Sequence, residues 1–114
     1  MKVIETETGK GLFSEKVYNY GDIIHRLEGP IYNKPSRTTI EIGDGKHIND
    51  EYGIYMNHSF SPTCKIENRC IVAICNISEG DELTFNYNEN ESSMSCPFID
   101  AVSKTYVSGK LNCV

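Results

Sequence analysis

The chain has 114 residues, 39% of them hydrophobic and 24% charged, and its eleven basic and sixteen acidic side chains give a formal net charge of −5. This length and composition predict one globular, soluble domain with its own core. The negative charge argues against direct nucleic-acid binding, and no apolar run approaches the roughly 20 residues that a membrane span needs. The acidity either attracts a basic, lysine-bearing segment or serves solubility alone.

The cysteines and the first residues indicate the compartment. Five cysteines are present, they form neither C-x-x-C nor C-x-C pairs, and residues 1–5 lack the apolar stretch of a signal peptide. An odd number of cysteines in a chain without a leader is typical of reduced thiols. We therefore expect an intracellular protein of the cytoplasm or nucleus.

The N-terminal residues 1–8 show a weak strand signal, after which Gly9 and Gly11 bend the backbone. Glycine at such a place lets a ligand approach the main chain closely. On these residues alone, a tight turn between two strands explains the glycines better than a ligand site does.

Short apolar or alternating runs separated by turn residues make up the middle of the chain. The expected strands are residues 12–13, 23–27, 39–42, 46–48, 64–67 and 69–74. Two prolines predict a loop over 30–37, and only 50–55 has the pattern of a single helical turn. His25 and His47 have no metal-ligand spacing and are expected to be structural. The pattern as a whole predicts a mostly β fold.

Two motifs follow. In the first, residues 56–62, consecutive Asn, His and Ser side chains crowd hydrogen-bonding groups before a proline that ends the segment, which suits a polar ligand. In the second, residues 79–87, the apolar Leu83, Phe85 and Tyr87 alternate with polar residues. In a strand this alternation places the two aromatic rings on one face.

At these motifs the chain resembles the SET-domain family of S-adenosylmethionine-dependent protein lysine methyltransferases. That family carries Asn-His-Ser with a proline soon after, here residues 57–62, and Gly-Asp/Glu-Glu-Leu-Thr-x-x-Tyr, here residues 80–87. Residues 9–13 resemble its N-terminal Gly-x-Gly. The resemblance implies a SET (β-clip) fold of short sheets, in which the C-terminal segment threads beneath a loop as a pseudoknot, an exception to the usual unthreaded connections.

The resemblance also implies a site. Tyr87 matches the catalytic tyrosine, which orients the lysine amine beside the donor methyl; whether Tyr87 or water takes the amine proton is left open. The residues carried over as contacts of S-adenosylmethionine are Thr8, Gly9, Lys10, Gly11, Leu12, Asn57 and His58. His58 as a general base is less favoured, and Glu82 is expected to hold the pseudoknot by hydrogen bonding. The alternative for Tyr87 is a core aromatic residue that packs across strands.

Phe85 stands where the family has a Phe/Tyr choice that tunes the number of methyl groups. Phenylalanine lacks the hydroxyl that would hold a water in the path of the methyl, so we expect the addition of more than one methyl group. Tyr52 and Tyr55 are candidates for the wall of the lysine channel, although a tyrosine in a β-rich core needs no such role.

The chain divides into a SET domain, residues 1–91, and a C-terminal segment, residues 92–114, that resembles the post-SET region of the family. Many members bind zinc there through a C-x-C-x4-C cluster, but Cys96 and Cys113 alone are too few for a tetrahedral site, so we expect no metal. The segment is expected to fold back as an aromatic cover, with Phe98 near the adenine of the donor. The alternative is a loosely docked tail.

The function implied by the resemblance is methyl transfer from S-adenosylmethionine to a lysine side chain of a protein, such as a histone or another basic protein. Small β domains also complete a site by pairing, so a homodimer is compatible with this function. The alternative is a module that keeps the SET scaffold without catalysis and holds a peptide along a sheet edge. The intact Tyr87, Asn57 and His58 favour the enzyme.

Overall fold

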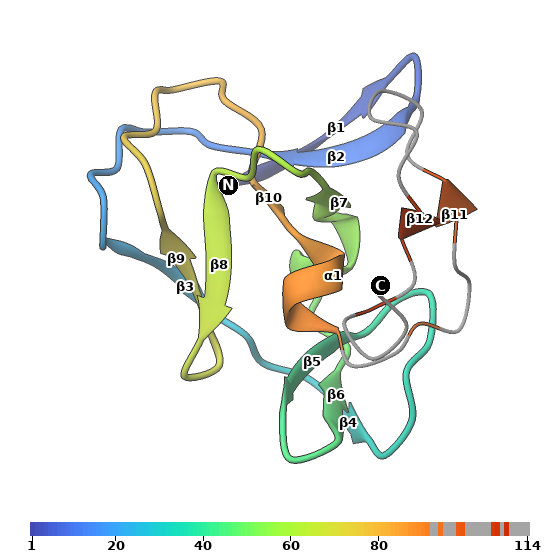
Figure 1. The fold of residues 1–114 in the computed structure, drawn as a ribbon. Coiled ribbons are helices and arrows are strands. Elements are labelled where there is room, and N and C mark those ends of the chain that lie inside the picture. The colour runs from blue at the N-terminus through green and yellow to red at the C-terminus, as the bar shows by residue number, and fades with distance from the viewer. Residues whose placement is uncertain (92–93, 95–97, 100–105, 108, 110–114) are drawn as a thin grey trace.

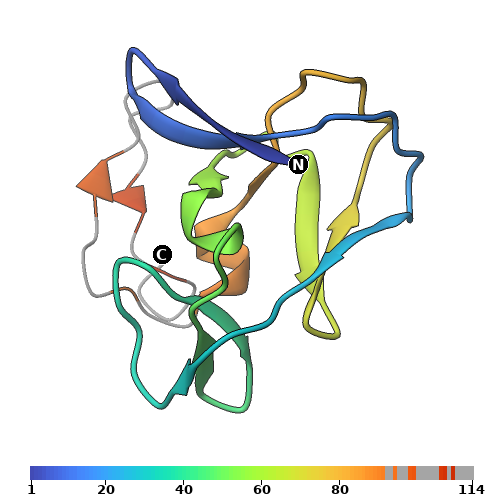
Figure 2. The same ribbon diagram turned by 180° about the vertical axis from the view of Figure 1, so that it is seen from behind.

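The computed structural model describes residues 1–91, 94, 98–99, 106–107 and 109. These residues form five small sheets of two or three strands each. One sheet, a pair of strands, lies at the centre beside a short helix, and the other four surround it (Figures 1 and 2). Among them, no helix has the length and apolar character required to cross a membrane. The mostly β fold expected from the sequence is confirmed.

The N-terminal hairpin pairs β1 (Lys2–Thr6) with β2 (Gly9–Phe13) in antiparallel register. Gly9 lies in the turn at φ +116°, a backbone conformation that disfavours any side chain. The hairpin ends on the core, because Leu12 is fully buried and its carbonyl accepts a hydrogen bond from the Leu83 N–H at 2.7 Å. The end of β2 is therefore tied to the second sequence motif.

Two three-stranded sheets lie on either side of the centre. In one, β9 (Cys70–Ala73) is the middle strand between β3 (Ile23–Arg26) and β8 (Cys64–Glu67), and all four β9 residues are buried. In the other, β6 (Lys46–Ile48) lies between β4 (Ile31–Tyr32) and β5 (Ile40–Gly43). The strand expected at 23–27 and the hairpin expected at 39–48 are both present. β4 adds a short strand inside the segment that the sequence predicts to be a loop.

The centre of the molecule is a parallel pair formed by β7 (Asn57–His58) and β10 (Thr84–Phe85), with Asn57 opposite Thr84 and His58 opposite Phe85. This pairing places the two motifs side by side (Figure 1). The 3₁₀ turn η1 (Gly53–Tyr55) precedes β7 and supplies the single helical turn that the sequence predicts. The threading of a pseudoknot stays a prediction.

The strand expected to carry Tyr87 ends two residues early. Residues Tyr87–Asn90 form the helix α1, and Asn86 in extended conformation caps it by accepting the Asn88 N–H at 2.9 Å. Asparagine at this position satisfies one of the free donors of the first turn. The two aromatic rings nevertheless lie together, since the Phe85 and Tyr87 ring centres are 4.8 Å apart.

The described C-terminal residues form the pair β11 (Phe98–Ile99) and β12 (Tyr106–Val107). Val107 is fully buried, and the Gly109 N–H donates to the Asn88 side-chain oxygen at 3.0 Å. These residues are thus docked against α1. The division into segments 1–91 and 92–114 stays a prediction.

The core joins all the sheets. Its largest fully buried side chains are Leu12, Leu27, Ile48, Ile71, Ile77, Leu83 and Val107. They come from the N-terminal hairpin, both three-stranded sheets and the second motif, so burial of these side chains fixes the positions of β7, β10 and α1.

Candidate functional site

Tyr87 is held in place at both ends. Its backbone N–H donates to His58 Nδ1 at 3.0 Å, and its hydroxyl donates to the Met56 carbonyl oxygen at 2.5 Å. Both acceptors come from the segment around β7, about thirty residues earlier in the chain. The first residue of α1 is therefore fixed in position and in ring orientation by the first motif.

The phenol of Tyr87 remains protonated at neutral pH. Burial raises its pKa above the ordinary value near 10, and the carboxylates of Glu91 and Glu82 raise it further, because both effects disfavour the phenolate. A phenol in this state is a hydrogen-bond donor and a lone-pair acceptor. It is a poor general base.

His58 lies among aromatic rings. Its ring centre is 4.2 Å from that of Phe60, 5.2 Å from that of Tyr87 and 6.1 Å from that of Phe98, all in edge-on arrangements. Because a backbone N–H can only donate, Nδ1 of His58 is the acceptor and the proton of the neutral ring sits on Nε2. With Nδ1 engaged and Nε2 protonated, the ring has a positioning role.

Asn57 connects the glycine turn to the second motif. Its side-chain amide donates to the Lys10 carbonyl oxygen at 3.1 Å and to Glu82 Oε2 at 2.9 Å. Glu82 thus accepts a hydrogen bond from the first motif, and its role in a pseudoknot stays a prediction. A Cβ on Gly11 would lie 2.8 Å from Glu82 Oε2 and 3.2 Å from Asn57 Nδ2, so a side chain here would displace the Asn57–Glu82 pair.

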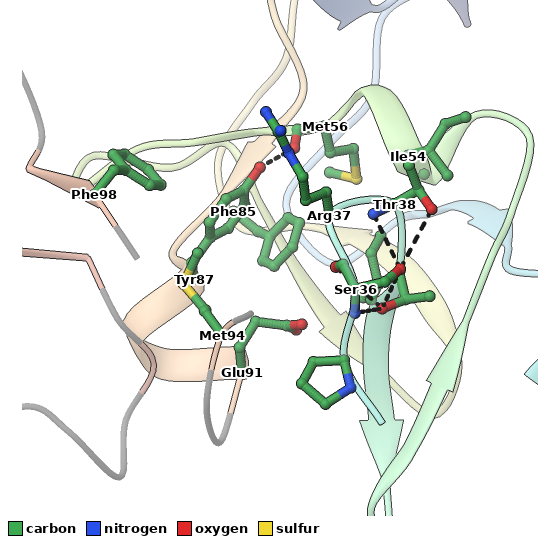
Figure 3. Close-up of a pocket in the computed structure, with 14 residues that line it drawn as sticks. Ser36, Arg37, Thr38, Ile54, Met56, Phe85, Tyr87, Glu91, Met94 and Phe98 are labelled. Carbon is green, nitrogen blue, oxygen red and sulfur yellow. Dashed lines mark hydrogen bonds between the residues drawn. The ribbon is translucent and has the colours of Figure 1, made fainter. Parts of the chain in front are cut away.

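A pocket of about 490 Å³ opens beside Tyr87. One wall is the loop 35–40 with part of η1, and the other contains Met56, Phe85, Tyr87 and Phe98 (Figure 3). Glu91, the residue after α1, and Met94 complete the lining that the structure describes. The pocket thus combines apolar and aromatic side chains with polar loop residues and the charged side chains of Arg37 and Glu91.

The structure places the residues predicted for the site in four groups, of which Tyr52 and Tyr55 are the last. Phe85, Tyr87 and Phe98 line the pocket, and His58 contacts both Tyr87 and Phe98. Asn57, next to His58, is hydrogen-bonded to Lys10 and lies close to Gly11. Thr8 is exposed on the turn, and Leu12 is a core residue with no exposed surface. Their contacts with a donor stay predictions.

Tyr52 and Tyr55 lie elsewhere. The Tyr52 ring packs edge-on against His25 with ring centres 5.5 Å apart, and the Lys10 ammonium lies 5.7 Å above the Tyr55 ring. Neither is among the described residues that line the pocket. Both pack against the core cluster that contains Phe85. Their place in a channel stays a prediction.

Sequence reasoning missed three parts of this region. Residues 35–37 were expected only as part of the loop 30–37 and residues 39–40 only as the start of a strand, and Glu91 and Met94 carried no local signal. Asp50 was also missed, although its buried carboxylate accepts from His25, from the Glu28 N–H and from the N–H groups at the start of η1. Burial alone raises the pKa of Asp50, but the donors of Glu28, Gly53, His25 and Tyr52 outweigh it and hold the pKa below its ordinary value.

The described cysteines and acids do not form a metal centre. Cys64, Cys70 and Cys75 are free thiols, and in the described part of the chain no three His, Cys, Asp or Glu side chains are placed to hold an ion. Burial raises the pKa of the Cys64 thiol to about 11, so this thiol stays protonated and unreactive at neutral pH. Cys96 and Cys113 lie outside the described residues.

Comparison with known proteins identifies the fold and the family. Among solved structures, the chain is similar to one in a humanized mutant of the Chaetomium thermophilum Polycomb Repressive Complex 2 bound to the inhibitor GSK126, with a TM-score of 0.58 and 17% sequence identity. The alignment covers 93% of this chain and 18% of that one, and at this identity the likeness shows the fold alone. No curated protein sequence matches the chain. The family model of the SET domain matches residues 14–88, which is more than half of the sequence, and the chain therefore belongs to the SET-domain family.

Proposed function

We propose that the protein transfers methyl groups from S-adenosylmethionine to the side-chain amine of a lysine in a protein substrate. The observation that carries this proposal is the position of the Tyr87 hydroxyl, which is fixed by Met56 and His58 on the wall of a pocket. Membership of the SET-domain family supports the same chemistry. This proposal implies protein substrates with exposed lysines. It also implies that the protein acts inside the cell.

The residues around Tyr87 fit a nucleoside-bearing sulfonium donor. Phe98 is 39% exposed and its ring centre lies 6.2 Å from that of Tyr87, so it presents an aromatic face on which a purine can stack. Gly9 and Lys10 are exposed residues, and a side chain at Gly11 would meet Glu82 and Asn57. Asn57 and His58 would bind the donor between this turn and Phe98.

The donor, when bound, supplies a methyl group on an electrophilic sulfonium. A free lysine has a pKa near about 10.4, so its amine must lose a proton before it can attack. The side chains of Ile54, Met56 and Phe85 line the pocket and exclude water from the entering amine, which lowers its pKa. The chain thus contributes desolvation of the nucleophile.

Tyr87 orients the amine without taking its proton. Its hydroxyl hydrogen is directed to the Met56 carbonyl, so the phenolic lone pairs are left to accept an N–H of the lysine amine. Since the raised pKa of the phenol makes the phenolate inaccessible, the amine proton leaves to water. Of the two routes compatible with the sequence, the release of the proton to water is the one we favour.

Phe85 supports the addition of more than one methyl group. Its side chain is 3% exposed, lines the pocket and lies against the Tyr87 ring. A phenylalanine here offers no hydroxyl to hold a water, which leaves space for an amine that already carries a methyl. A tyrosine at this position would fill that space.

The direct test combines donor binding with transfer. We expect calorimetry to detect binding of S-adenosylmethionine, and label from the donor to appear on lysines of a mixture of basic proteins, identified by mass spectrometry. Heat of binding without any label transfer would favour the alternative, a SET scaffold that binds peptides without catalysis. Absence of both would contradict the proposal and leave the fold assignment intact.

A further inference from the structure

We propose that Arg37 makes this enzyme selective for lysines that have an acidic residue close by in the substrate. This inference rests on the proposed lysine methyltransferase function and adds a substrate class to it. It starts from the loop 35–40, which forms one wall of the pocket beside Tyr87. In Figure 3 the Arg37 side chain extends from this loop toward the part of the pocket where the Tyr87 hydroxyl lies.

Arg37 differs from the other arginines of the chain. The sequence has three, all within the described ranges, and the other two form ion pairs with Glu28: Arg26 at 3.0 Å and Arg69 at 3.3 Å. Arg37 is exposed, and among the residues that the structure describes it makes no hydrogen bond or ion pair. Its five donors are therefore available to a ligand at the pocket.

The loop carries this cation on an ordered backbone. The Ser36 N–H donates to the Thr39 hydroxyl at 2.9 Å, and the Asn49 side-chain amide donates to the Thr38 hydroxyl at 2.9 Å. These bonds hold the residues on both sides of Arg37 and join the loop to the end of β6. A planar guanidinium presented from a fixed backbone binds a carboxylate through two parallel hydrogen bonds.

The charges around the pocket match such a substrate. Between residues 29 and 40 the chain has Lys34 and Arg37 and no acidic residue, although the protein carries a net charge of −5. Glu91 is the one acid among the described lining residues, and it does not come from this loop. An ammonium that enters on the side of Arg37 meets a like charge, which opposes its approach. A carboxylate next to the lysine in the substrate cancels this repulsion and pairs with the guanidinium, so electrostatic complementarity selects acidic neighbours.

The test uses a pool of random lysine-containing dodecapeptides and labelled donor, with mass spectrometry of the methylated products. We expect Asp and Glu to be enriched around the modified lysine for wild type, and the enrichment to disappear for Arg37→Gln. For one peptide pair that differs by Glu against Gln, wild type should prefer Glu by roughly three- to tenfold in kcat/KM, the range for a partly exposed arginine–carboxylate pair. The variant should treat both peptides alike.

A matched control is Lys34→Gln, which removes the same charge from the same loop at a residue outside the described lining of the pocket. It should keep the preference for the Glu peptide, and both variants should unfold at the wild-type temperature because both side chains are exposed. If Arg37→Gln lowers kcat/KM equally for both peptides, or if wild type prefers basic neighbours, the inference is overturned.

A second readout separates this inference from the proposed function. Fluorescence anisotropy measures binding of the labelled Glu and Gln peptides without any methyl transfer. A Glu preference that depends on Arg37, in a protein that transfers no methyl group, would support the site and contradict the enzyme. Equal binding of the two peptides by wild type would contradict the site, whatever the transfer assay shows.

Discussion

Asp50 and Tyr87 both connect segments that lie far apart in the sequence, but they use their hydrogen bonds differently. Each oxygen of the Asp50 carboxylate accepts at least two donors of the chain, and its side chain is 2% exposed. Tyr87 is fixed through its N–H and its hydroxyl hydrogen, while its ring lines a pocket. Asp50 is fully engaged by the fold, whereas Tyr87 has part of its surface on a pocket.

The difference separates structure from function within one small domain. When all acceptor atoms of a buried polar group are bonded to the chain, none is available to a substrate. Replacing such a group should lower the free energy of unfolding. Another kind of group is held in place by the chain and has lone pairs available at a cavity. Replacing it should lower the reaction rate. The predictions below test whether this division holds.

Replacement of Asp50 should have the largest effect on stability. Asp50→Ala leaves His25 and the N–H groups of Glu28, Tyr52 and Gly53 without their buried acceptor. We expect the free energy of unfolding to fall by about 3–5 kcal/mol, the range for breaking a buried charged network. Urea unfolding measures it.

The control for Asp50 is Glu7→Ala, an exposed acid on the turn of the first hairpin. A surface change of this kind should stay within about 0.5 kcal/mol of wild type. If Asp50→Ala is as mild as Glu7→Ala, the carboxylate does not hold the segments together and the comparison with Tyr87 fails.

Gly11 tests the packing between the glycine turn and Asn57. A Cβ at this position meets Glu82 Oε2 at 2.8 Å, so Gly11→Ala should cost about 1–3 kcal/mol of stability and weaken the binding of S-adenosylmethionine. The matched control is Gly45→Ala, at φ +69° with open space around it, which should cost about 1 kcal/mol and leave donor binding unchanged. Equal donor affinity in both variants would separate the turn from the donor site.

Acid should remove the contribution of Asp50. Its pKa in the folded protein is below the ordinary value, so its stabilising effect is complete above the unfolded pKa of about 3.9 and is lost as the pH falls through the folded value. We expect the stability difference between wild type and Asp50→Asn to be constant from pH 7 to about 5 and to shrink below about 4. A difference that persists unchanged to pH 2.5 would argue against a lowered pKa.

Phe85→Tyr should change the product more than the rate. The ring centres of Phe85 and Tyr87 are 4.8 Å apart. A hydroxyl added to the Phe85 ring would occupy space beside Tyr87 and leave less room for a methylated amine. We expect mass spectra of a methylated peptide to show more than one added methyl group for wild type and a lower number for the variant. Equal numbers of methyl groups would remove Phe85 from the control of the product.

The sequence contains much of this fold and part of the site. Runs of alternating residues predict most strands, and the family motifs single out Asn57, His58, Phe85 and Tyr87. The parallel pairing of β7 with β10 has no local signal, because it joins residues 27 positions apart, Thr84 with Asn57. Family resemblance, and not periodicity, therefore brings the two motifs together before the structure does.

The remaining features depend on tertiary contacts. Helix α1 spans only Tyr87–Asn90, too short for a helical period, and Asn86 is its one sequence signal. The donors of Asp50 include groups 22 and 25 residues away, so its role cannot be read locally. In the sequence, Arg37 is one charged residue of a loop. Only the structure shows that this loop lines the pocket.

The most direct test of the account compares methyl transfer by wild type and Tyr87→Phe at saturating S-adenosylmethionine and peptide. The variant keeps the ring and loses only the hydroxyl, so we expect folding and donor binding to persist while the transfer rate falls by about 10²-fold or more. A variant that transfers methyl groups at the wild-type rate would contradict the assignment of Tyr87 as the residue that orients the reacting amine.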